Sequence, residues 1–254
     1  MNQYFYENFE ITELSYFEYK NLVKNLFTDD LFVLNRVFEN TIKRSVKDVA
    51  YIDILDKVKI LLFLRSLTLG EEVNIIVNDK NYKLNVNSIL DKITINRGDI
   101  ISDKVVFKKS NSFYIDNVLN EVMRCVQKIL LDESEIDFSK LTVEQKEVIF
   151  NEISDSNLVD IVNNISNNLK EDNLKLFDID LNLHNGEILY FLKNIFNTDL
   201  NSLYDLEYHL IRNLNLNTVD FQNYSLSEMK ILLNKLKEEF KDVNKHSGSG
   251  VSIN

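Results

Sequence analysis

The chain has 254 residues, enough for one large domain or two small ones with an ample hydrophobic core. Acidic residues outnumber basic ones by 40 to 29, and the net charge of −11 argues against nucleic acid as a partner, since that needs a basic face. The longest apolar stretch, Ile60 to Leu64, is too short to cross a bilayer, so we expect no membrane partner. The first residues lack the basic and apolar regions of a secretory signal, which favours a protein kept in a cytoplasm or packed into a particle assembled there.

An α+β domain of three helices, a β-hairpin and short strands is predicted over residues 1–131. Its first element is expected to be one extended segment from Phe5 to Leu14. Phe5, Phe9 and Ile11 can share one face of this segment, with polar residues on the other.

Three helices are predicted after this segment, each from apolar residues at helical spacing behind a polar capping residue. The third helix is expected to include Ile52 and to end at Gly70, a suitable C-cap. The expected N-terminal caps are Ser15 with Glu18 as a capping box, Asp29 or Asp30, and Asp48.

The pattern then changes to the two-residue alternation of β-strands. Residues 73–77 and 82–86 alternate on either side of an Asn/Asp loop, which predicts a hairpin. Another strand is expected at 105–107. From Phe113 to Ile129 the helical period returns, and Cys125, the only cysteine, is expected to be a small buried hydrophobe in that helix.

A helical connector is predicted over residues 132–173, because the charged run at 132–135 interrupts the apolar pattern. Thr142 and Gln145 have capping-box spacing and predict a short helix. A second, Asn-rich helix is expected at 158–169.

A mainly helical C-terminal unit is predicted over residues 174–243, followed by a flexible tail at 244–254. Leu174 to Leu183 alternates as a strand. The three helices are expected at 187–196, at 200–214, and from Ser225, which forms a capping box with Glu228, to about Asp242.

No recognised catalytic, cofactor-binding or metal-binding motif occurs in the chain, so we expect no catalytic residues, no cofactor and no metal. Asp178, Asp180 and Asn182 have the first spacings of a calcium loop, but Leu183 stands where that loop needs glycine. A small-molecule enzyme built around Cys125 or a carboxylate cluster remains an alternative.

Seven aromatic residues lie close together near the C-terminus, and both a core role and an interface role fit them. They are Tyr190, Phe191, Phe196, Tyr204, Tyr208, Phe221 and Tyr224.

Three segments together resemble baseplate hub proteins of the T-even-type contractile-tailed bacteriophages. These are an opening strand followed by a helix at 14–22, a helix running into a hairpin at 56–70, and the helical run of 188–196, 200–208 and 226–240. The chain also lacks Pro and Trp and has Ala50 as its only alanine, as expected for an AT-rich genome, and an AT-rich phage genome fits this composition.

The resemblance implies a non-enzymatic role in the tail baseplate hub, as a hub subunit or as an assembly factor. It implies other baseplate and hub proteins as partners, and a location in the host cytoplasm during assembly or in the virion tail. Independently of the resemblance, we expect Phe191, Tyr204 and Tyr208 to form the partner interface. The alternative is a cytoplasmic adaptor that presents the C-terminal helices to an unrelated partner.

Overall fold

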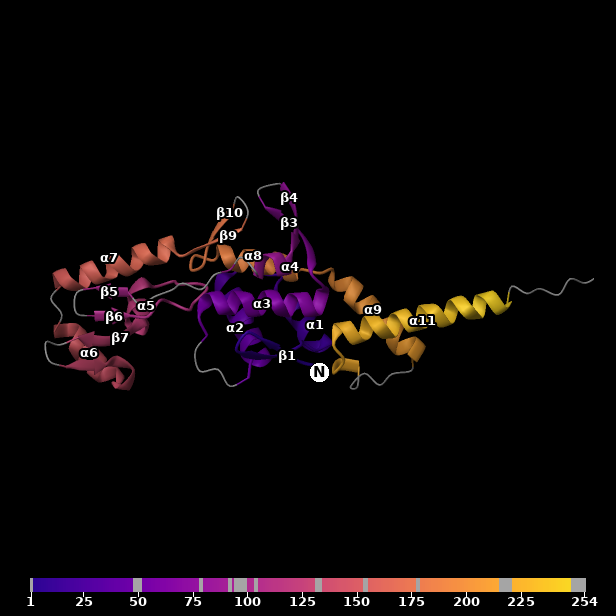
Figure 1. The fold of residues 1–254 in the computed structure, drawn as a ribbon, viewed down its shortest axis with the longest axis horizontal. Helices are drawn as coiled ribbons and strands as arrows, with labels where there is room; N and C mark the ends of the chain where they lie inside the picture. Colours follow the sequence, from indigo (N-terminus) through magenta and orange to yellow (C-terminus); the bar gives the residue numbers. More distant parts are fainter. Residues whose placement is uncertain are drawn as a thin grey trace, which may run out of the picture. The chain divides into compact units, whose positions relative to one another are not determined.

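The computed structural model describes residues 2–47, 52–77, 80–90, 93, 100–102, 105–130, 134–152, 155–176, 179–214 and 221–247 (Figure 1). It confirms the predicted α+β class, because helices are combined with small antiparallel sheets. The chain divides into two compact units. Unit 1 contains residues 1–49, 60–90 and 193–254, and unit 2 contains residues 50–59 and 91–192. Each unit combines segments far apart in the sequence, whereas the sequence predicts successive domains divided at 131 and 173.

Unit 1 begins with a β-hairpin, so the single extended segment predicted over 5–14 is wrong. β1 (Gln3–Tyr6) pairs antiparallel with β2 (Phe9–Thr12). Glu7 lies in the turn with a φ of 51°. A glutamate is uncommon in the left-handed region, where glycine is usual. Because this turn has no glycine, the sequence does not indicate a hairpin here.

The hairpin register also corrects the prediction that Phe5 shares the face of Ile11. Phe5 pairs with Glu10, and Ile11 pairs with Tyr4. Because neighbouring residues of a strand point to opposite faces, Phe5 lies on the face opposite to Tyr4 and Ile11. Phe5 is 81% exposed and Ile11 is fully buried. On the buried side, the Tyr6 ring stacks on Phe63 with ring centroids 4.8 Å apart.

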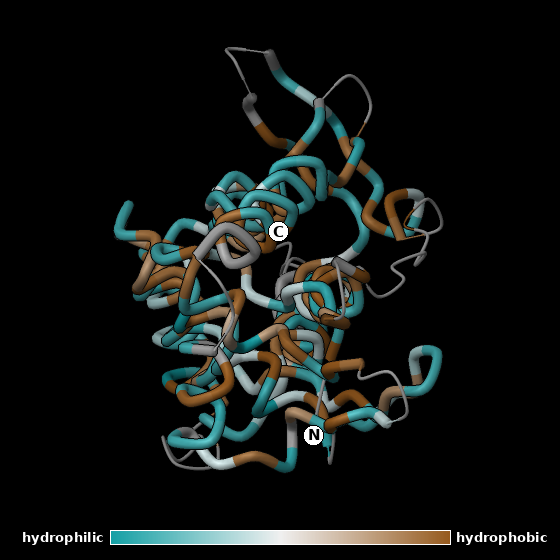
Figure 2. Tube along the Cα trace, turned by 90° about the vertical axis from the view of Figure 1, so that its left-hand side faces the viewer, coloured by the Kyte–Doolittle hydropathy of each residue, from teal (hydrophilic) through white to brown (hydrophobic). Residues whose placement is uncertain are grey.

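Helix α1 (Tyr16–Asn25) begins at the predicted capping box. Ser15 N donates to Glu18 Oε2 at 2.9 Å, and Glu18 N donates back to Ser15 Oγ at 3.2 Å. The predicted apolar stripe of this helix is buried: Tyr19, Leu22, Val23 and Leu26. Hydrophobic and hydrophilic residues alternate along the trace of the chain (Figure 2).

Helix α2 (Leu31–Ser45) follows Asp30, which is therefore the cap rather than Asp29. Asp30 Oδ1 accepts a hydrogen bond from Phe32 N at 2.8 Å. Phe38, on the inner face of α2, packs against Phe196, and the centroids of the two rings lie 6.0 Å apart.

Helix α3 (Ile54–Leu69) starts later than predicted, because Asp53 caps it and Ile52 precedes it. Asp53 Oδ1 accepts from Leu55 N at 2.9 Å. The predicted cap, Asp48, lies outside the described residues. The predicted end of α3 is confirmed, since Gly70 has a φ of 94°, which glycine adopts at no steric cost.

The predicted hairpin after α3 is also confirmed. β3 (Glu72–Val77) pairs antiparallel with β4 (Lys80–Asn85), and the short helix α4 (Val86–Leu90) follows. The Asn/Asp loop residues at 78 and 79 lie outside the described residues.

Three helices follow in the C-terminal part of the chain, at the predicted positions: α8 (Glu187–Phe196), α9 (Leu200–Leu214) and α11 (Leu226–Ser247). Helix α11 continues past the predicted end at Asp242, so residues 244–247 of the predicted flexible tail are helical. The first helix-breaking residue of that stretch is Gly248, which explains why helix can extend to the residue before it.

The N-termini of α1 and α11 lie together in unit 1. Ser225 N donates to Glu228 Oε2 at 2.8 Å, which confirms the second predicted capping box. Ser15 and Ser225 form an antiparallel bridge, and Tyr16 N donates to the Tyr224 carbonyl at 2.7 Å. Two helix starts more than 200 residues apart in sequence are thus joined by backbone hydrogen bonds.

A buried arginine links the ends of several elements of unit 1. Arg65 Nε donates to the Ile195 carbonyl at 2.9 Å, Nη1 donates to the Gly70 carbonyl, and Nη2 donates to the Glu72 carbonyl at 3.1 Å. Arg65 is only 5% exposed, and burial lowers its pKa. Its planar guanidinium therefore satisfies carbonyls at the C-terminal ends of α3 and α8 and at the start of β3.

Unit 2 contains a four-stranded antiparallel sheet in the order β5-β6-β7-β8. Its second strand confirms the strand predicted at 105–107. The strands are β5 (Ile100–Ser102), β6 (Val105–Phe107), β7 (Val126–Leu130) and β8 (Glu135–Asp137).

The long helix predicted from Phe113 to Ile129 is wrong. Helix α5 (Val118–Cys125) covers only its middle, with Asn117 as the N-cap. The chain then enters β7, where Val126 pairs with Phe107. The β-branched residues at 126 and 129 favour a strand once a neighbouring strand pairs with them, which sequence spacing does not reveal. Cys125 is buried, as predicted.

The segment predicted as a connector forms η1 (Phe138–Lys140), α6 (Val143–Glu152) and α7 (Asp155–Glu171). The predicted capping box opens α6, since Thr142 N donates to Gln145 Oε1 at 2.9 Å. Helix α7 supplies Ile161 and Ile165 to a core cluster that includes Phe107 of the sheet. This segment is therefore part of a packed unit.

The single strand predicted over 174–183 is a hairpin of β9 (Asn173–Leu176) and β10 (Ile179–Asn182). The alternation of apolar and polar residues predicts strand structure correctly, but the alternating residues belong to two strands and not to one. The residues between the two strands, 177 and 178, lie outside the described residues.

We expect Arg65→Met to lower the free energy of unfolding by about 3 kcal/mol, because it leaves buried carbonyls without a donor. Urea unfolding followed by circular dichroism measures the change. Arg36→Met, on the exposed side of α2, serves as the matched control and should change the value by less than about 0.5 kcal/mol. Equal losses for both variants would contradict this role of Arg65.

We expect Glu228→Ala to cost about 1 kcal/mol, because it removes the acceptor for the Ser225 N–H at the start of α11. Glu238→Ala lies on the exposed surface of the same helix and should be nearly neutral. Thermal unfolding of both variants distinguishes loss of the cap from loss of a charge.

Candidate interaction surface

Helix α9 is oriented by an apolar face turned inward. Leu203 and Leu210 are buried, while Tyr204 and Tyr208, on the opposite side, are 44% and 55% exposed. The helix is capped by Asp199, which accepts from the backbone N–H and the hydroxyl of Ser202. The Ser202 hydroxyl, with backbone N–H groups, lowers the pKa of Asp199.

Two buried tyrosines of α1 hold the start of α9 in place. Tyr16 Oη donates to the Leu203 carbonyl at 2.7 Å, and Tyr19 Oη donates to the Phe196 carbonyl at 3.1 Å. Burial raises the pKa of Tyr16, with a further contribution from the Glu207 carboxylate. Burial also raises the pKa of Tyr19 to about 12.

The Lys20–Glu207 ion pair closes the junction between α1 and α9. Lys20 Nζ lies 2.5 Å from Glu207 Oε2, and both side chains are largely buried. Tyr16 Oη also donates to this carboxylate oxygen at 3.3 Å. Glu207 therefore serves the junction and leaves little negative charge on the surface beside it.

Basic side chains lie against both exposed tyrosine rings. Lys20 Nζ is 5.0 Å and Lys24 Nζ is 5.5 Å from the Tyr204 ring centroid. Arg212 Cζ is 5.8 Å from the Tyr208 centroid, and its Nη1 donates to Tyr208 Oη at 2.9 Å. These cation–π contacts restrict the rotamers of both tyrosines before any partner binds.

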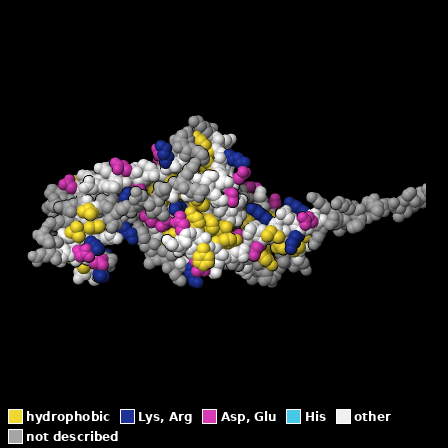
Figure 3. Space-filling view, viewed as in Figure 1, with side chains coloured by type: hydrophobic (Ala, Val, Ile, Leu, Met, Phe, Trp, Pro, Cys, Tyr) yellow, Lys and Arg dark blue, Asp and Glu magenta, His cyan; other side chains and the backbone are white. Residues whose placement is uncertain are grey.

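We call this surface the aromatic–basic face. Phe17, 44% exposed, lies one helical turn before Lys20 on α1 and belongs to it. Figure 3 shows basic and acidic side chains interspersed with hydrophobic ones over the α9 and α11 end of unit 1. Its members are Phe17, Lys20, Lys24, Tyr204, Tyr208 and Arg212.

The structure brings together two of the three predicted interface residues. Tyr204 and Tyr208 lie one turn apart on α9, whereas Phe191 is only 5% exposed within α8 and is not accessible to a partner. On α8, Glu187, Tyr190 and Asn194 share the exposed side at intervals of three and four residues, and this spacing indicates that Tyr190 rather than Phe191 faces solvent. The sequence reasoning missed Lys24 and Arg212, although the four-residue spacing of Tyr208 and Arg212 was visible.

The remaining aromatics of the C-terminal run are divided between core and surface. Phe196 and Phe221 are fully buried, and Phe221 packs edge-on against Tyr16 with centroids 5.2 Å apart. Tyr224 is half-buried and Tyr190 is 39% exposed.

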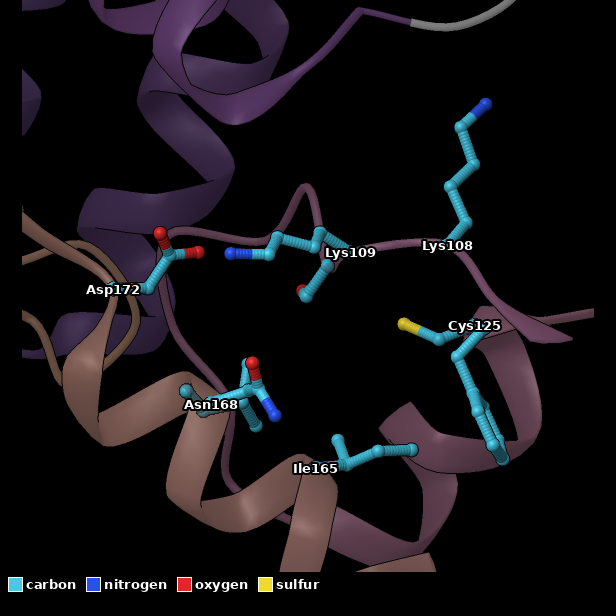
Figure 4. A pocket seen from close by; sticks show the side chains of 9 residues that line it. Lys108, Lys109, Cys125, Ile165, Asn168 and Asp172 are labelled. Carbon is cyan, nitrogen blue, oxygen red and sulfur yellow. The ribbon is translucent and has the colours of Figure 1, made fainter. Parts of the chain in front are cut away.

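The surroundings of Cys125 in unit 2 bear on an enzymatic reading. Cys125 Sγ points into a small pocket, with Lys109 directed toward Asp172 on its far side (Figure 4). The cavity measures about 10 Å³, which is room for one water molecule at most. The thiol donates to Glu121 Oε1 at 3.6 Å, and Ser110 Oγ donates to the same oxygen. Cys125 thus shares one carboxylate oxygen with Ser110, and Lys108 and Lys109 also line this pocket.

His184 is another buried polar side chain of unit 2. Its Nδ1 lies 2.7 Å from the Ser112 carbonyl, and its Nε2 lies 3.0 Å from Asp172 Oδ2. Both neighbours accept hydrogen bonds, so the ring acts as a buried crosslink between the segment before α5 and the β9–β10 hairpin. His209, by contrast, is exposed on α9 beside Tyr208.

Within the described residues, no group of three or more His, Cys, Asp or Glu side chains is arranged to hold a metal ion. Among these residues, no helix is both long and apolar enough to span a bilayer. Comparison with protein-family models, curated proteins and solved structures finds no match to this chain.

The raised pKa of Tyr19 predicts alkaline destabilisation. The unfolded chain releases the tyrosine proton near pH 10, whereas the folded protein holds it to about pH 12. Stability is therefore fully present below pH 10 and falls by about 2 kcal/mol as the pH rises toward 12. We expect Tyr19→Phe to make this fall shallower, as measured by urea unfolding across the pH range. Tyr208→Phe, at an exposed position, should leave the slope unchanged, and an equal effect of both would contradict the assignment.

Proposed function

We propose that this protein is a non-enzymatic structural or assembly component of a phage tail baseplate hub, and that it acts through protein–protein interfaces. The partners are other baseplate and hub proteins, met in the host cytoplasm during assembly. The proposal joins two independent arguments: the resemblance of three sequence segments, and the aromatic–basic face.

The observation that carries the interface part is the exposure of Tyr204 and Tyr208 on a firmly held helix. Tyrosine and arginine are enriched among residues that dominate binding energy, because they bury a large area at little entropic cost. Here the rings are already oriented by Lys20, Lys24 and Arg212. The backbone beneath them is fixed by the hydrogen bond from Tyr16 to the Leu203 carbonyl. A partner would meet a surface that needs little reorganisation.

Three polar groups of unit 2 have partners within the unit, which supports a structural role for them. Glu121, Cys125 and His184 are each engaged in hydrogen bonds within the protein. Their arrangement stabilises the unit, and the Cys125 cavity is too small for a substrate.

The test is co-purification of the tagged protein with hub proteins from cells in which the phage tail is being assembled. We expect Tyr204→Ala/Tyr208→Ala to reduce the recovered hub proteins by about tenfold or more, because two anchor residues are lost. Both side chains lie on the surface, so the free energy of unfolding should change by less than about 1 kcal/mol.

Tyr190→Ala is the matched control, since Tyr190 is also a partly exposed tyrosine but lies outside the aromatic–basic face. Recovery of hub proteins at the wild-type level with the double variant would contradict the interface. Recovery of none with the wild-type protein, together with normal tails in its absence, would contradict the hub role and favour the adaptor reading. Its presence in purified mature particles would mark a hub subunit, and its absence an assembly factor.

A further inference from the structure

Two cations of the aromatic–basic face, Lys24 and Arg212, form no ion pair with the described residues of this chain. Lys20 is paired with Glu207. Lys24 and Arg212, in contrast, have no carboxylate partner within the described part of the chain; their recorded contacts are with the rings of Tyr204 and Tyr208. A protein with eleven more acidic than basic residues thus presents two unneutralised cations beside two exposed tyrosines.

The spacing of these groups suits an elongated ligand. Tyr204, Tyr208 and Arg212 follow one another at intervals of four residues, so they form one row on α9 about 12 Å long. Lys24 of α1 lies beside the Tyr204 end of the row. Cations therefore stand at both ends of the row, with aromatic surface between them.

The aromatic groups are arranged for side chains rather than for nucleic-acid bases. Base stacking needs free ring faces, but Lys20 and Lys24 lie over the Tyr204 ring and Arg212 lies over the Tyr208 ring. The Tyr204 hydroxyl has no hydrogen-bond partner among the described residues and can donate to a carboxylate.

We propose that the aromatic–basic face binds an acidic segment of a partner protein, whose carboxylates pair with Lys24 and Arg212 while its apolar side chains cover Tyr204 and Tyr208. This inference rests on the proposed function, because it names the chemistry of the partner at the same surface. Since the rest of the protein is acidic, such a segment is attracted to this face and repelled elsewhere, which fixes where it docks.

The test uses a photo-crosslinker at the edge of the face. In the full chain, His209→benzoylphenylalanine places the reactive group next to Tyr208 and keeps every member of the aromatic–basic face. Irradiation of cells assembling phage tails, followed by mass spectrometry, identifies the crosslinked peptide. Glu147→benzoylphenylalanine, at an exposed position in unit 2, is the control for nonspecific capture.

We expect a partner peptide rich in Asp and Glu, crosslinked at position 209 and not at position 147. Adding Lys24→Glu and Arg212→Glu should lower the yield by about tenfold or more, whereas Lys235→Glu and Lys237→Glu, the same charge change on the exposed side of α11, should leave it within about twofold.

A crosslinked peptide that is basic or uncharged, a nucleic acid, or a second copy of this chain would overturn the inference, as would a yield that the Lys24 and Arg212 changes leave unaltered. The two proposals fail separately. An acidic partner that is not a tail protein would support the acidic-segment inference and contradict the hub role. A tail protein captured through a basic segment would support the hub role and contradict the acidic-segment inference.

Discussion

The buried guanidinium of Arg65 is the interaction on which unit 1 depends. Helix C-termini leave carbonyls without intrahelical partners, and α3 and α8 both end inside the unit. Arg65 donates to the carbonyls of Ile195, Gly70 and Glu72, so one side chain joins the end of α8 to the junction of α3 and β3, which lies far from it in sequence. A lysine at this position would offer one point charge in place of a planar fork and would not reach all three.

The exposed surface follows from this arrangement. Once the end of α8 is fixed at Ile195, α9 begins a few residues later and is held against α1 by Tyr16 and Tyr19. Leu203 and Leu210 then face inward, which leaves Tyr204 and Tyr208 outward. The exposed surface is thus a consequence of the buried hydrogen bonds beneath it. Substitutions that weaken those bonds would disorder the surface although no exposed residue is changed.

The sequence predicted best what depends on local chemistry. The capping boxes at Ser15 and Ser225 and the glycine end of α3 were all recognised, because each requires only a few neighbouring residues. It predicted poorly what depends on pairing partners. The strand at 126–130 looked like more helix, and two hairpins looked like single strands, since the turn at Glu7 carries no glycine and the partner of β7 lies some twenty residues earlier. At the candidate surface, Tyr204 and Tyr208 were found from residue type. The cations around the tyrosines required the packing of α1 against α9.

We propose that an acidic protein segment covers the aromatic–basic face, formed by residues of α1 and α9, in an assembled tail hub. Determining the structure of the hub complex captured with this protein tests it most directly. The account predicts that Tyr204 and Tyr208 are buried by a partner whose carboxylates lie within hydrogen-bonding distance of Lys24 and Arg212. A complex in which these side chains remain open to solvent, while another surface contacts the partner, would contradict it.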